Sequence, residues 1–199
     1  MRLVGVTGGP ASGKSLAAHI MEASGAMRFS ADEAAHSILN PESPIVHSIA
    51  DKFGRDLLDQ EGRIIRRLLA QQVFSDRASR LELNQIMHPP ILRLLRSQIE
   101  ACKDDIPTRQ LLVIEVPLLF ETRMESWFDQ IVTVVSTEEL QLTRLCERGM
   151  DRGTAILQIK SHWPSSLKAA RSHHSLDNTG CIDQLEGRIH ELLAKLLIL

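Results

Sequence analysis

Short apolar runs are spaced along the chain between longer segments with a helical pattern. Residues 2–7 and 111–116 are apolar and rich in β-branched side chains, which is typical of strands buried on both faces of a parallel sheet. Residues 131–135 predict a further strand of this kind. Residues 26–29 and 175–180 predict two shorter strands, the last followed by a turn. The pattern as a whole favours an α/β fold.

The longest helical stretch lies between residues 44 and 103. One helix is expected to end at Gly54, and a second is expected over residues 68–74. Pro89 and Pro90 are expected to open a third helix in its first turn, where proline is tolerated. About sixty helical residues between two strands exceed an ordinary crossover connection. We therefore expect an inserted helical domain that binds the substrate.

The last segment of the chain predicts an amphipathic helix that packs on the sheet. Its apolar residues recur every three or four positions. They are Ile182, Leu185, Ile189, Leu192, Leu193 and Leu196. Another helix is expected after residue 135, because residues 136–139 read Ser-Thr-Glu-Glu and predict a capping box at its start.

Composition and charge narrow the function classes. The 199 residues suit one domain, or one α/β domain with an insertion, and the net charge of −2 gives no sign of a nucleic-acid or membrane surface. No apolar run approaches the length of about eighteen residues that a membrane span needs. Cys102, Cys146 and Cys181 lack the spacing of a metal site. They are expected to be free thiols, so we expect a cytoplasmic protein.

Residues 8–15 contain the strongest functional signal. They read Gly-Gly-Pro-Ala-Ser-Gly-Lys-Ser and match G-x-x-x-x-G-K-[ST] at every fixed position, between a predicted strand and a predicted helix. The backbone N–H groups of this loop and of the helix N-terminus would cradle phosphate oxygens. Lys14 would reach the β- and γ-phosphates, and the Ser15 hydroxyl would bind Mg²⁺. The sequence therefore predicts binding of a nucleoside triphosphate.

Two acidic residues come at the ends of predicted strands. Asp32 follows the strand at 26–29, and Glu115 lies near the end of the strand at 111–116. Ligands bind at the carboxyl edge of open α/β sheets, so Asp32 could accept a proton from an attacking hydroxyl or hold Mg²⁺ through water, and Glu115 could act near Mg²⁺. Asp32 could equally be a first-turn helix residue after a Ser30 cap, and Glu115 a polar strand terminus. The spacing alone leaves both alternatives open.

Arg144 and Arg148 are four residues apart and would share one face of a helix. Such a pair usually makes a solvated surface. In a P-loop kinase the pair could instead close over the triphosphate from a mobile lid and stabilise the transferring phosphoryl group. Arg152, Lys160 and Lys168 continue the basic trend through a polar helical stretch.

Taken together, these residues make a sequence that resembles the dephospho-CoA kinase family over almost the whole chain. Many kinases share the phosphate-binding loop, but two further segments are far more specific to this family. They are His88-Pro89 and Pro117-Leu118-Leu119-Phe120-Glu121. Other matches are Ala31–His36, Phe53-Gly54, Arg66, Val73-Phe74, Gln141, Arg144, Arg148, Lys168 and Asp177–Gly180.

The resemblance implies an ATP-dependent enzyme that phosphorylates the ribose 3′-hydroxyl of dephospho-CoA, giving CoA and ADP in the last step of coenzyme A biosynthesis. It implies a three-layer P-loop kinase fold with a five-stranded parallel sheet, a helical acceptor domain and a lid. The nucleotide-binding core would comprise residues 1–43, 104–143 and 172–199, the acceptor domain residues 44–103, and the lid residues 144–171. The partners would be ATP and dephospho-CoA, with Mg²⁺ as the cofactor, and we expect a monomer.

The resemblance also implies roles for particular residues. Asp32 falls on the family's catalytic base, which favours the catalytic alternative, and Lys14 and Arg144 complete the expected catalytic set. The expected ATP site comprises Gly9, Pro10, Ala11, Ser12, Gly13, Lys14, Ser15, Leu16, Arg148 and Asn178. The expected acceptor site comprises Asp32, Arg66, His88, Pro117 and Leu118.

Several positions depart from the family's usual residues. They are Ser30, Glu115, His162 and the pair Ser172-His173. None removes the phosphate-binding loop, its lysine or the expected base, but together they suggest a divergent member with weakened ATP or Mg²⁺ binding.

Two other functions stay open: a P-loop kinase with another small acceptor, and an ATP-binding module without catalysis. The helical insertion argues against the first, and Lys14 and Asp32 argue against the second.

Overall fold

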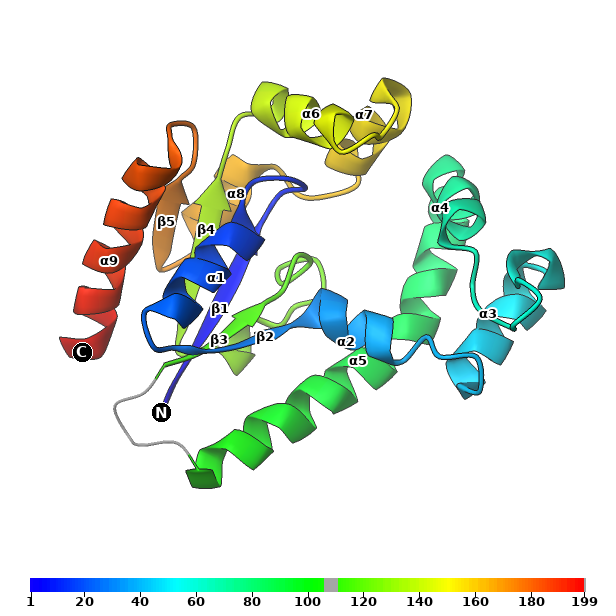
Figure 1. The fold of residues 1–199 in the computed structure, drawn as a ribbon, viewed down its shortest axis with the longest axis horizontal. Coiled ribbons are helices and arrows are strands. Elements are labelled where there is room, and N and C mark those ends of the chain that lie inside the picture. Colours follow the sequence, from blue (N-terminus) through cyan, green and yellow to red (C-terminus); the bar gives the residue numbers. More distant parts are fainter. Residues whose placement is uncertain (106–110, 199) are drawn as a thin grey trace. The chain divides into compact units, whose positions relative to one another are not determined.

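The computed structural model describes residues 1–105 and 111–198 (Figure 1). Contacts between residues divide the chain into two compact units. The sheet unit comprises Met1–Ser30 and Asp105–Leu199, and the helical unit comprises Ala31–Asp104. Within the described ranges, no helix has both the length and the apolar character needed to cross a bilayer.

The sheet unit is built on five parallel strands in the order β2-β3-β1-β4-β5. The strands are β1 (Arg2–Gly8), β2 (Met27–Ser30), β3 (Leu111–Glu115), β4 (Gln130–Val135) and β5 (His174–Asp177). β1 is central, since Val4 pairs with Val113 on one side and with Gln130 on the other. The expected five-stranded parallel sheet is confirmed. The end of β1, where the phosphate-binding loop begins, lies at the carboxyl edge of this sheet, the edge where ligands bind in such folds.

Helices α1 (Lys14–Ala23) and α9 (Ile182–Ile198) lie side by side on one face of the sheet (Figure 1). Met21 of α1 and Ile189 of α9 share one apolar core with strand residues such as Val4, Val132 and Val134. Removing this apolar surface from water is the main stabilising term of the unit. The apolar runs in the sequence are therefore buried as the pattern predicts.

The other face of the sheet meets α8 (Ser165–Arg171), which contacts β1 and β4. Successive strand side chains point to opposite faces, so Thr133 points away from the core that holds its neighbours Val132 and Val134. Its hydroxyl forms a 2.5 Å hydrogen bond with the hydroxyl of Ser172, just after α8. Helices α6 (Glu138–Glu147) and α7 (Arg152–Lys160), and a 3₁₀ turn η2 (Glu125–Trp127), complete the unit. The arrangement has three layers.

The helical unit contains α2 (Ala31–Ser37), α3 (Pro44–Phe53), the 3₁₀ turn η1 (Arg55–Leu57), α4 (Arg66–Ser75) and most of α5 (Arg77–Asp105). The Ser43 hydroxyl caps α3 by accepting the N–H of Ile45 at 3.2 Å. Gly54 ends α3 with φ 109°, as the sequence predicts. Ile49, Phe53, Leu57, Leu69 and Val73 form a separate apolar core.

The expectation that Pro89 and Pro90 open a third helix is wrong. α5 starts well before both prolines and continues through them. Proline lacks an N–H and clashes with the preceding turn, which costs about 3 kcal/mol or more inside a helix. Before the prolines, Leu83, Ile86 and Met87 pack on the apolar core of the helical unit. This tertiary packing offsets the cost of the prolines, and no local sequence pattern reveals it.

Two other expectations differ in detail. Ile182 is 59% exposed, so the apolar stripe of α9 that packs on the sheet begins at Leu185. The residue that caps α6 is Thr137, whose hydroxyl accepts the N–H of Leu140 at 3.2 Å. A leucine at that position cannot return a hydrogen bond, so the helix starts with a simple cap and not with the expected capping box.

The two units also divide the chain differently from the expected domains. Residues 31–43 belong to the helical unit, and residues 144–171 belong to the sheet unit. Part of the expected core segment, residues 106–110 and 199, lies outside the described residues.

Candidate active site

The phosphate-binding loop connects β1 to α1. Gly13, directly before α1, has φ 97°, and Ala11 has φ 51°, so both adopt the left-handed conformation. The first turn of α1 carries no acidic residue, and Gly13 has no side chain that could cap the free N–H groups. These N–H groups and the positive end of the helix dipole are therefore available to an anion.

Close neighbours require glycine at two positions of the loop. A Cβ atom on Gly8 would lie 2.6 Å from the carbonyl oxygen of Val134 on β4. A Cβ atom on Gly13 would overlap the side-chain amide of Asn178. That amide donates a 2.7 Å hydrogen bond to the carbonyl of Ser12. The loop is thus packed against the ends of β4 and β5, and only glycine fits at both positions.

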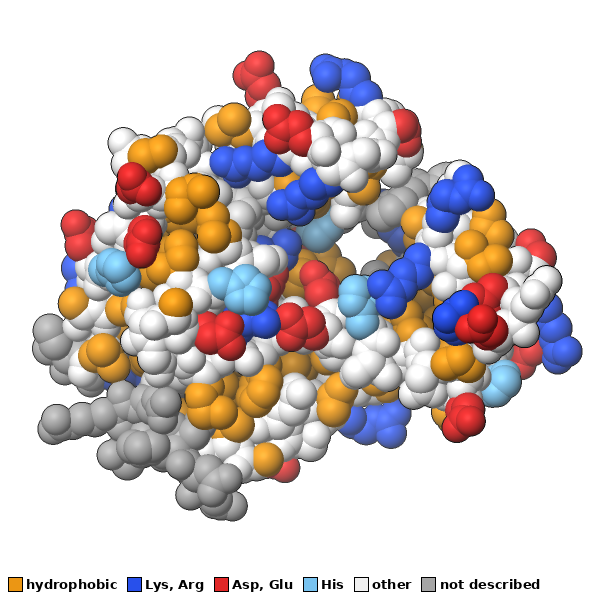
Figure 2. All heavy atoms as spheres, in the orientation of Figure 1, with side chains coloured by type: hydrophobic (Ala, Val, Ile, Leu, Met, Phe, Trp, Pro, Cys, Tyr) orange, Lys and Arg blue, Asp and Glu red, His pale blue; other side chains and the backbone are white. Residues whose placement is uncertain are grey.

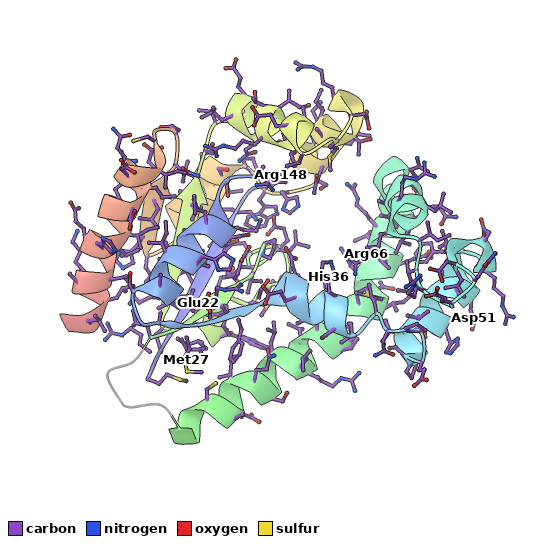
Figure 3. The ribbon with its side chains drawn as sticks, in the orientation of Figure 1. Glu22, Met27, His36, Asp51, Arg66 and Arg148 are labelled. Atoms are coloured by element: carbon purple, nitrogen blue, oxygen red, sulfur yellow. The ribbon has the colours of Figure 1, made fainter. Side chains whose placement is uncertain are left out.

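Arg144 joins three segments around the loop. Its Nη1 donates to the carbonyl of Ala11 and to the hydroxyl of Ser136, each at 3.2 Å. Its Nη2 donates to the carbonyl of Asn178 at 3.0 Å. Arg148, the C-cap residue of α6, is exposed (Figure 3). The two arginines therefore differ: Arg144 is built into the wall of the site, and Arg148 lies at its rim.

A cavity of about 250 Å³ opens beside the phosphate-binding loop. Its lining residues are Ala11, Gly13, Lys14, Ser15, Leu16, Arg144, Arg148, Asn178, Gly180 and Ile182. Figure 2 shows Lys and Arg side chains between α6 and α1, on the side of the sheet unit where this cavity lies. Gly9 and Pro10 line a second cavity of about 470 Å³ together with residues of α6, α7 and α8. The loop thus separates two spaces, and positive charge surrounds the first.

Glu115, at the end of β3, is 2% exposed and lies next to the serine expected to bind Mg²⁺. The Ser15 hydroxyl donates to its Oε1 at 2.5 Å, and Nη1 of Arg28 lies 4.0 Å from its Oε2. Nε of Arg28 also donates a hydrogen bond to Glu22 of α1 at 3.1 Å, and this bond holds the pKa of Glu22 below its usual range. These contacts orient the Ser15 hydroxyl and favour the functional alternative for Glu115 over a plain strand terminus.

Three of the expected acceptor residues belong to the helical unit. Asp32 is the second residue of α2 and is exposed. Arg66, at the start of α4, donates to Nε2 of His36 at 2.7 Å, and the two side chains point toward one another in Figure 3. Since Arg66 can only donate, Nε2 of His36 is the acceptor of this hydrogen bond. His88 lies in the middle of α5, where burial lowers its pKa.

The other two expected acceptor residues, Pro117 and Leu118, begin the turn after β3. The carbonyl of Pro117 accepts hydrogen bonds from the Thr7 hydroxyl at 3.3 Å and from Nζ of Lys168 at 2.7 Å. Lys168 also pairs with Glu121 at 2.9 Å. Lys168 and Glu121 are both among the sequence matches to the family, but no local pattern predicts their contact, because the two residues lie far apart in the chain.

The site offers only a few oxygen atoms that could bind a metal ion. Among the described residues, no group of three or more His, Cys, Asp and Glu side chains could hold a metal ion. Cys102, Cys146 and Cys181 are free. Mg²⁺ usually keeps several waters and binds one or two protein oxygens together with substrate phosphates. The Ser15 hydroxyl, oriented by a buried carboxylate, fits that kind of binding.

Comparisons with known proteins identify the family. A family model described as dephospho-CoA kinase matches residues 2–184. The chain belongs to the dephospho-CoA kinase family. The dephospho-CoA kinase of Syntrophotalea carbinolica is 38% identical over 198 residues, which cover 99% of this chain and 93% of that protein. That of Corynebacterium diphtheriae is 37% identical over 193 residues, which cover 96% of each.

Solved structures share the fold of this chain. TT1252 from Thermus thermophilus superposes with a TM-score of 0.77 at 27% identity, over 98% of this chain and 97% of that chain. Dephospho-CoA kinase from Campylobacter jejuni superposes with a TM-score of 0.71 at 23% identity, over the same shares. A shikimate kinase from Acinetobacter baumannii shares the fold with a TM-score of 0.54 at 13% identity, over 100% of this chain and 94% of that chain. The expected P-loop kinase fold is therefore confirmed.

Members of the dephospho-CoA kinase family phosphorylate dephospho-CoA with ATP in the final step of coenzyme A biosynthesis.

Two residues that depart from the family's pattern lie directly before β5 and bind that end of the strand to β4. The backbone N–H of His173 donates to the carbonyl of Ile131, and Nδ1 of His173 accepts the Ile131 N–H, each at 3.0 Å. Ser172 bonds Thr133. These two departures are accommodated by hydrogen bonds to β4.

Proposed function

We propose that this chain transfers the γ-phosphoryl group of ATP to the ribose 3′-hydroxyl of dephospho-CoA, giving CoA and ADP. One observation carries the proposal: an anion-ready phosphate-binding loop, with Lys14 and Ser15 lining the cavity beside it, in a chain that belongs to the dephospho-CoA kinase family. The loop supplies the chemistry of the donor, and the family supplies the acceptor.

On the donor side, the triphosphate would lie against residues 9–16. The N–H groups of the loop and of the α1 N-terminus would bind the phosphate oxygens, and Lys14 would reach the β- and γ-phosphates. The N–H donors are fixed before ATP arrives, because the loop is bonded to Asn178 and Arg144. Arg148, at the rim of the same cavity, would add positive charge beside the nucleotide.

Ser15 and Glu115 are the residues proposed to hold Mg²⁺. The Ser15 hydroxyl donates a hydrogen bond to Glu115, so the lone pairs of its oxygen remain available to a cation. Glu115 adds negative charge next to that oxygen. When bound, Mg²⁺ neutralises charge on the phosphates.

On the acceptor side, Asp32 is the proposed base. Its carboxylate would take the proton of the ribose 3′-hydroxyl while a bond forms between O3′ and the γ-phosphorus. The bond from the γ-phosphorus to the oxygen that bridges it to the β-phosphate breaks, and ADP leaves with that oxygen. Arg144 would stabilise the charge that develops on the transferring group.

Arg66, His88, Pro117 and Leu118 are proposed to bind the acceptor. His88 has a lowered pKa through burial, which favours its neutral form, and a neutral imidazole can both donate and accept hydrogen bonds to a ribose. The sequence places the lid at residues 144–171. Because Arg144 is bonded to the phosphate-binding loop and α8 packs on the sheet, α7 (Arg152–Lys160) is the part of this segment proposed to close over the site. Free thiols at all three cysteines support the proposal of a cytoplasmic enzyme, and we propose that it acts as a monomer.

A panel of acceptors tests the function. The protein is incubated with ATP, Mg²⁺ and equal concentrations of dephospho-CoA, adenosine, AMP, CMP or shikimate, and the product masses are measured. We expect CoA to form fastest and adenosine to react far more slowly, because contacts remote from the reacting atoms supply binding energy used in the transition state. Faster transfer to AMP or CMP than to dephospho-CoA would replace this proposal with a nucleoside monophosphate kinase.

A further inference from the structure

The turn of residues 117–121 after β3, called here the acceptor turn, is anchored at both ends by one buried lysine. The Lys168 side chain is 0% exposed. Its Nζ lies 2.7 Å from the Pro117 carbonyl oxygen and 2.9 Å from Oε1 of Glu121. The backbone N–H of Trp163 donates to the same Oε1 at 2.9 Å. The segment containing α8 therefore holds the first and the last residue of the turn.

A second donor connects the acceptor turn to the phosphate-binding loop. The hydroxyl of Thr7, a fully buried residue directly before Gly8, donates to the Pro117 carbonyl at 3.3 Å. A carbonyl oxygen has two lone pairs, so Thr7 and Lys168 together use both. This one oxygen is thus fixed from the strand that leads into the loop and from α8. The contact sets the spacing between the acceptor turn and the loop within the sheet unit.

Packing alone does not explain a lysine at this position. Burial lowers the pKa of Lys168, and only the charge of Glu121 and the hydrogen bond to it act in the opposite direction. A buried ion pair is often no more stable than well-packed apolar residues of similar size. An apolar side chain of similar length, such as methionine, would fill the same space, but only lysine also donates hydrogen bonds in fixed directions. A displacement of about 1 Å in a group that positions a substrate can lower a rate on the order of 100-fold.

We propose that Lys168 is a positioning residue for phosphoryl transfer: it fixes the Pro117 carbonyl, and through it the acceptor turn, relative to the phosphate-binding loop. The proposal rests on the proposed function, because it assumes that Pro117 and Leu118 contact the acceptor. Lys168 itself touches neither substrate in this view. Its removal should change how the acceptor is used and leave ATP binding as it is.

The variants separate this role from a structural one. Lys168→Met keeps the length of the side chain and removes the donor, but it leaves Glu121 without its cation, and Oε2 of Glu121 is already buried without a partner among the described residues. The double variant Lys168→Met/Glu121→Gln removes that charge as well and keeps an acceptor for the Trp163 N–H. Thr7→Val removes the other donor to Pro117 with little change of shape. Lys195→Met, at an exposed lysine of α9, is the matched control.

Steady-state kinetics with dephospho-CoA and with ATP, ATP affinity by calorimetry and the melting temperature are measured for each variant. We expect the double variant to melt near the wild type and to bind ATP with an affinity within about twofold. Its kcat/KM for dephospho-CoA should fall at least about tenfold. Thr7→Val should lower kcat/KM for dephospho-CoA by roughly threefold. This loss is smaller because a neutral hydrogen bond contributes less than one from a charged donor. Lys195→Met should match the wild type.

The outcomes are distinguishable. An unchanged kcat/KM for dephospho-CoA in the double variant would mean that Lys168 only balances the charge of Glu121. A fall in ATP affinity and in melting temperature together with the fall in kcat/KM for dephospho-CoA would mean that Lys168 has a general structural role. Either of these two results overturns the proposal. If the double variant does not fold, Thr7→Val alone decides between these outcomes. A wild-type protein that transfers nothing to dephospho-CoA would instead refute the proposed function.

Discussion

Replacement of Arg144 by alanine should lower both stability and ATP affinity, whereas the same change at Arg148 should lower ATP affinity alone. Arg144 donates three hydrogen bonds at 3.0–3.2 Å, to Ala11, Ser136 and Asn178. All three partners are less than 10% exposed. Removal of the guanidinium therefore leaves two carbonyls and a hydroxyl with little access to water as a replacement donor.

The magnitude follows from these contacts. A hydrogen bond from a charged group contributes about 1.5–3 kcal/mol, but contributions around one side chain do not add fully, and this side chain is only partly buried. We take a loss of about 3 kcal/mol in the free energy of unfolding, which lowers the melting temperature by roughly 6–12 °C for a chain of this size. Arg148 is exposed, and within the described residues its side chain makes no hydrogen bond, so Arg148→Ala should change stability by less than about 0.5 kcal/mol.

The assay compares the two variants with the wild type by urea unfolding and by ATP titration calorimetry. ATP affinity should fall in both, because both side chains line the cavity beside the loop. Arg144→Lys is a further control: it keeps the charge but cannot reach three acceptors at once, so its stability should fall between those of wild type and Arg144→Ala. The reasoning is refuted if Arg144→Ala unfolds at the same urea concentration as Arg148→Ala.

Further variants test single steps of the proposed reaction. Lys14→Ala should nearly abolish turnover at an unchanged melting temperature, because its charge is needed where negative charge develops; a folded variant with most of its activity would contradict this. Asp32→Asn should lower kcat at least about 100-fold with ATP affinity unchanged, since asparagine is a poor proton acceptor. A near-normal kcat would return Asp32 to a helix-terminal role. The lowered pKa of His88 means that the unfolded chain binds its proton more readily, so stability should fall as the pH drops below about 6.5. The fall in urea midpoint between pH 7.5 and 5.5 should be smaller in His88→Gln, and an equal fall would rule out a contribution from His88.

The parts of the fold that sequence patterns predicted are those that local chemistry determines. An apolar β-branched run followed by the glycine loop and Lys14 predicts a strand, a tight turn and a helix start, and the structure has all three. Gly54 ends α3 because its φ of 109° suits glycine and almost no other residue. Pro89 and Pro90 lie inside α5 because the helix is stabilised by the residues it packs against. A local rule for proline could not include this packing, so it placed the start of the helix wrongly.

The candidate site also contains some residues whose roles local sequence patterns predict and others whose roles depend on contacts between distant parts of the chain. The loop residues follow from a motif with fixed spacing. For Glu115 the sequence left two alternatives open, and its hydrogen bond from Ser15 favours the functional one. Helical spacing placed Arg144 and Arg148 on one face but could not tell that one is built into the wall and the other exposed, because this depends on neighbours distant in the sequence. The same holds for the pair of Lys168 and Glu121.

The pairing of β1 has a consequence for synthesis of the chain on the ribosome. β1 is made first, yet its two neighbours in the sheet are β3 and β4, whose residues pair with it from Leu111 and Gln130 onward. At about 5–20 residues per second, roughly 5–20 seconds pass before the first of these partners is made. During that interval the contiguous helical unit can assemble around its own core, while the backbone N–H and C=O groups along both edges of β1 stay unpaired and open to other chains. The nascent protein is therefore most exposed to aggregation at β1, the strand that leads into the phosphate-binding loop.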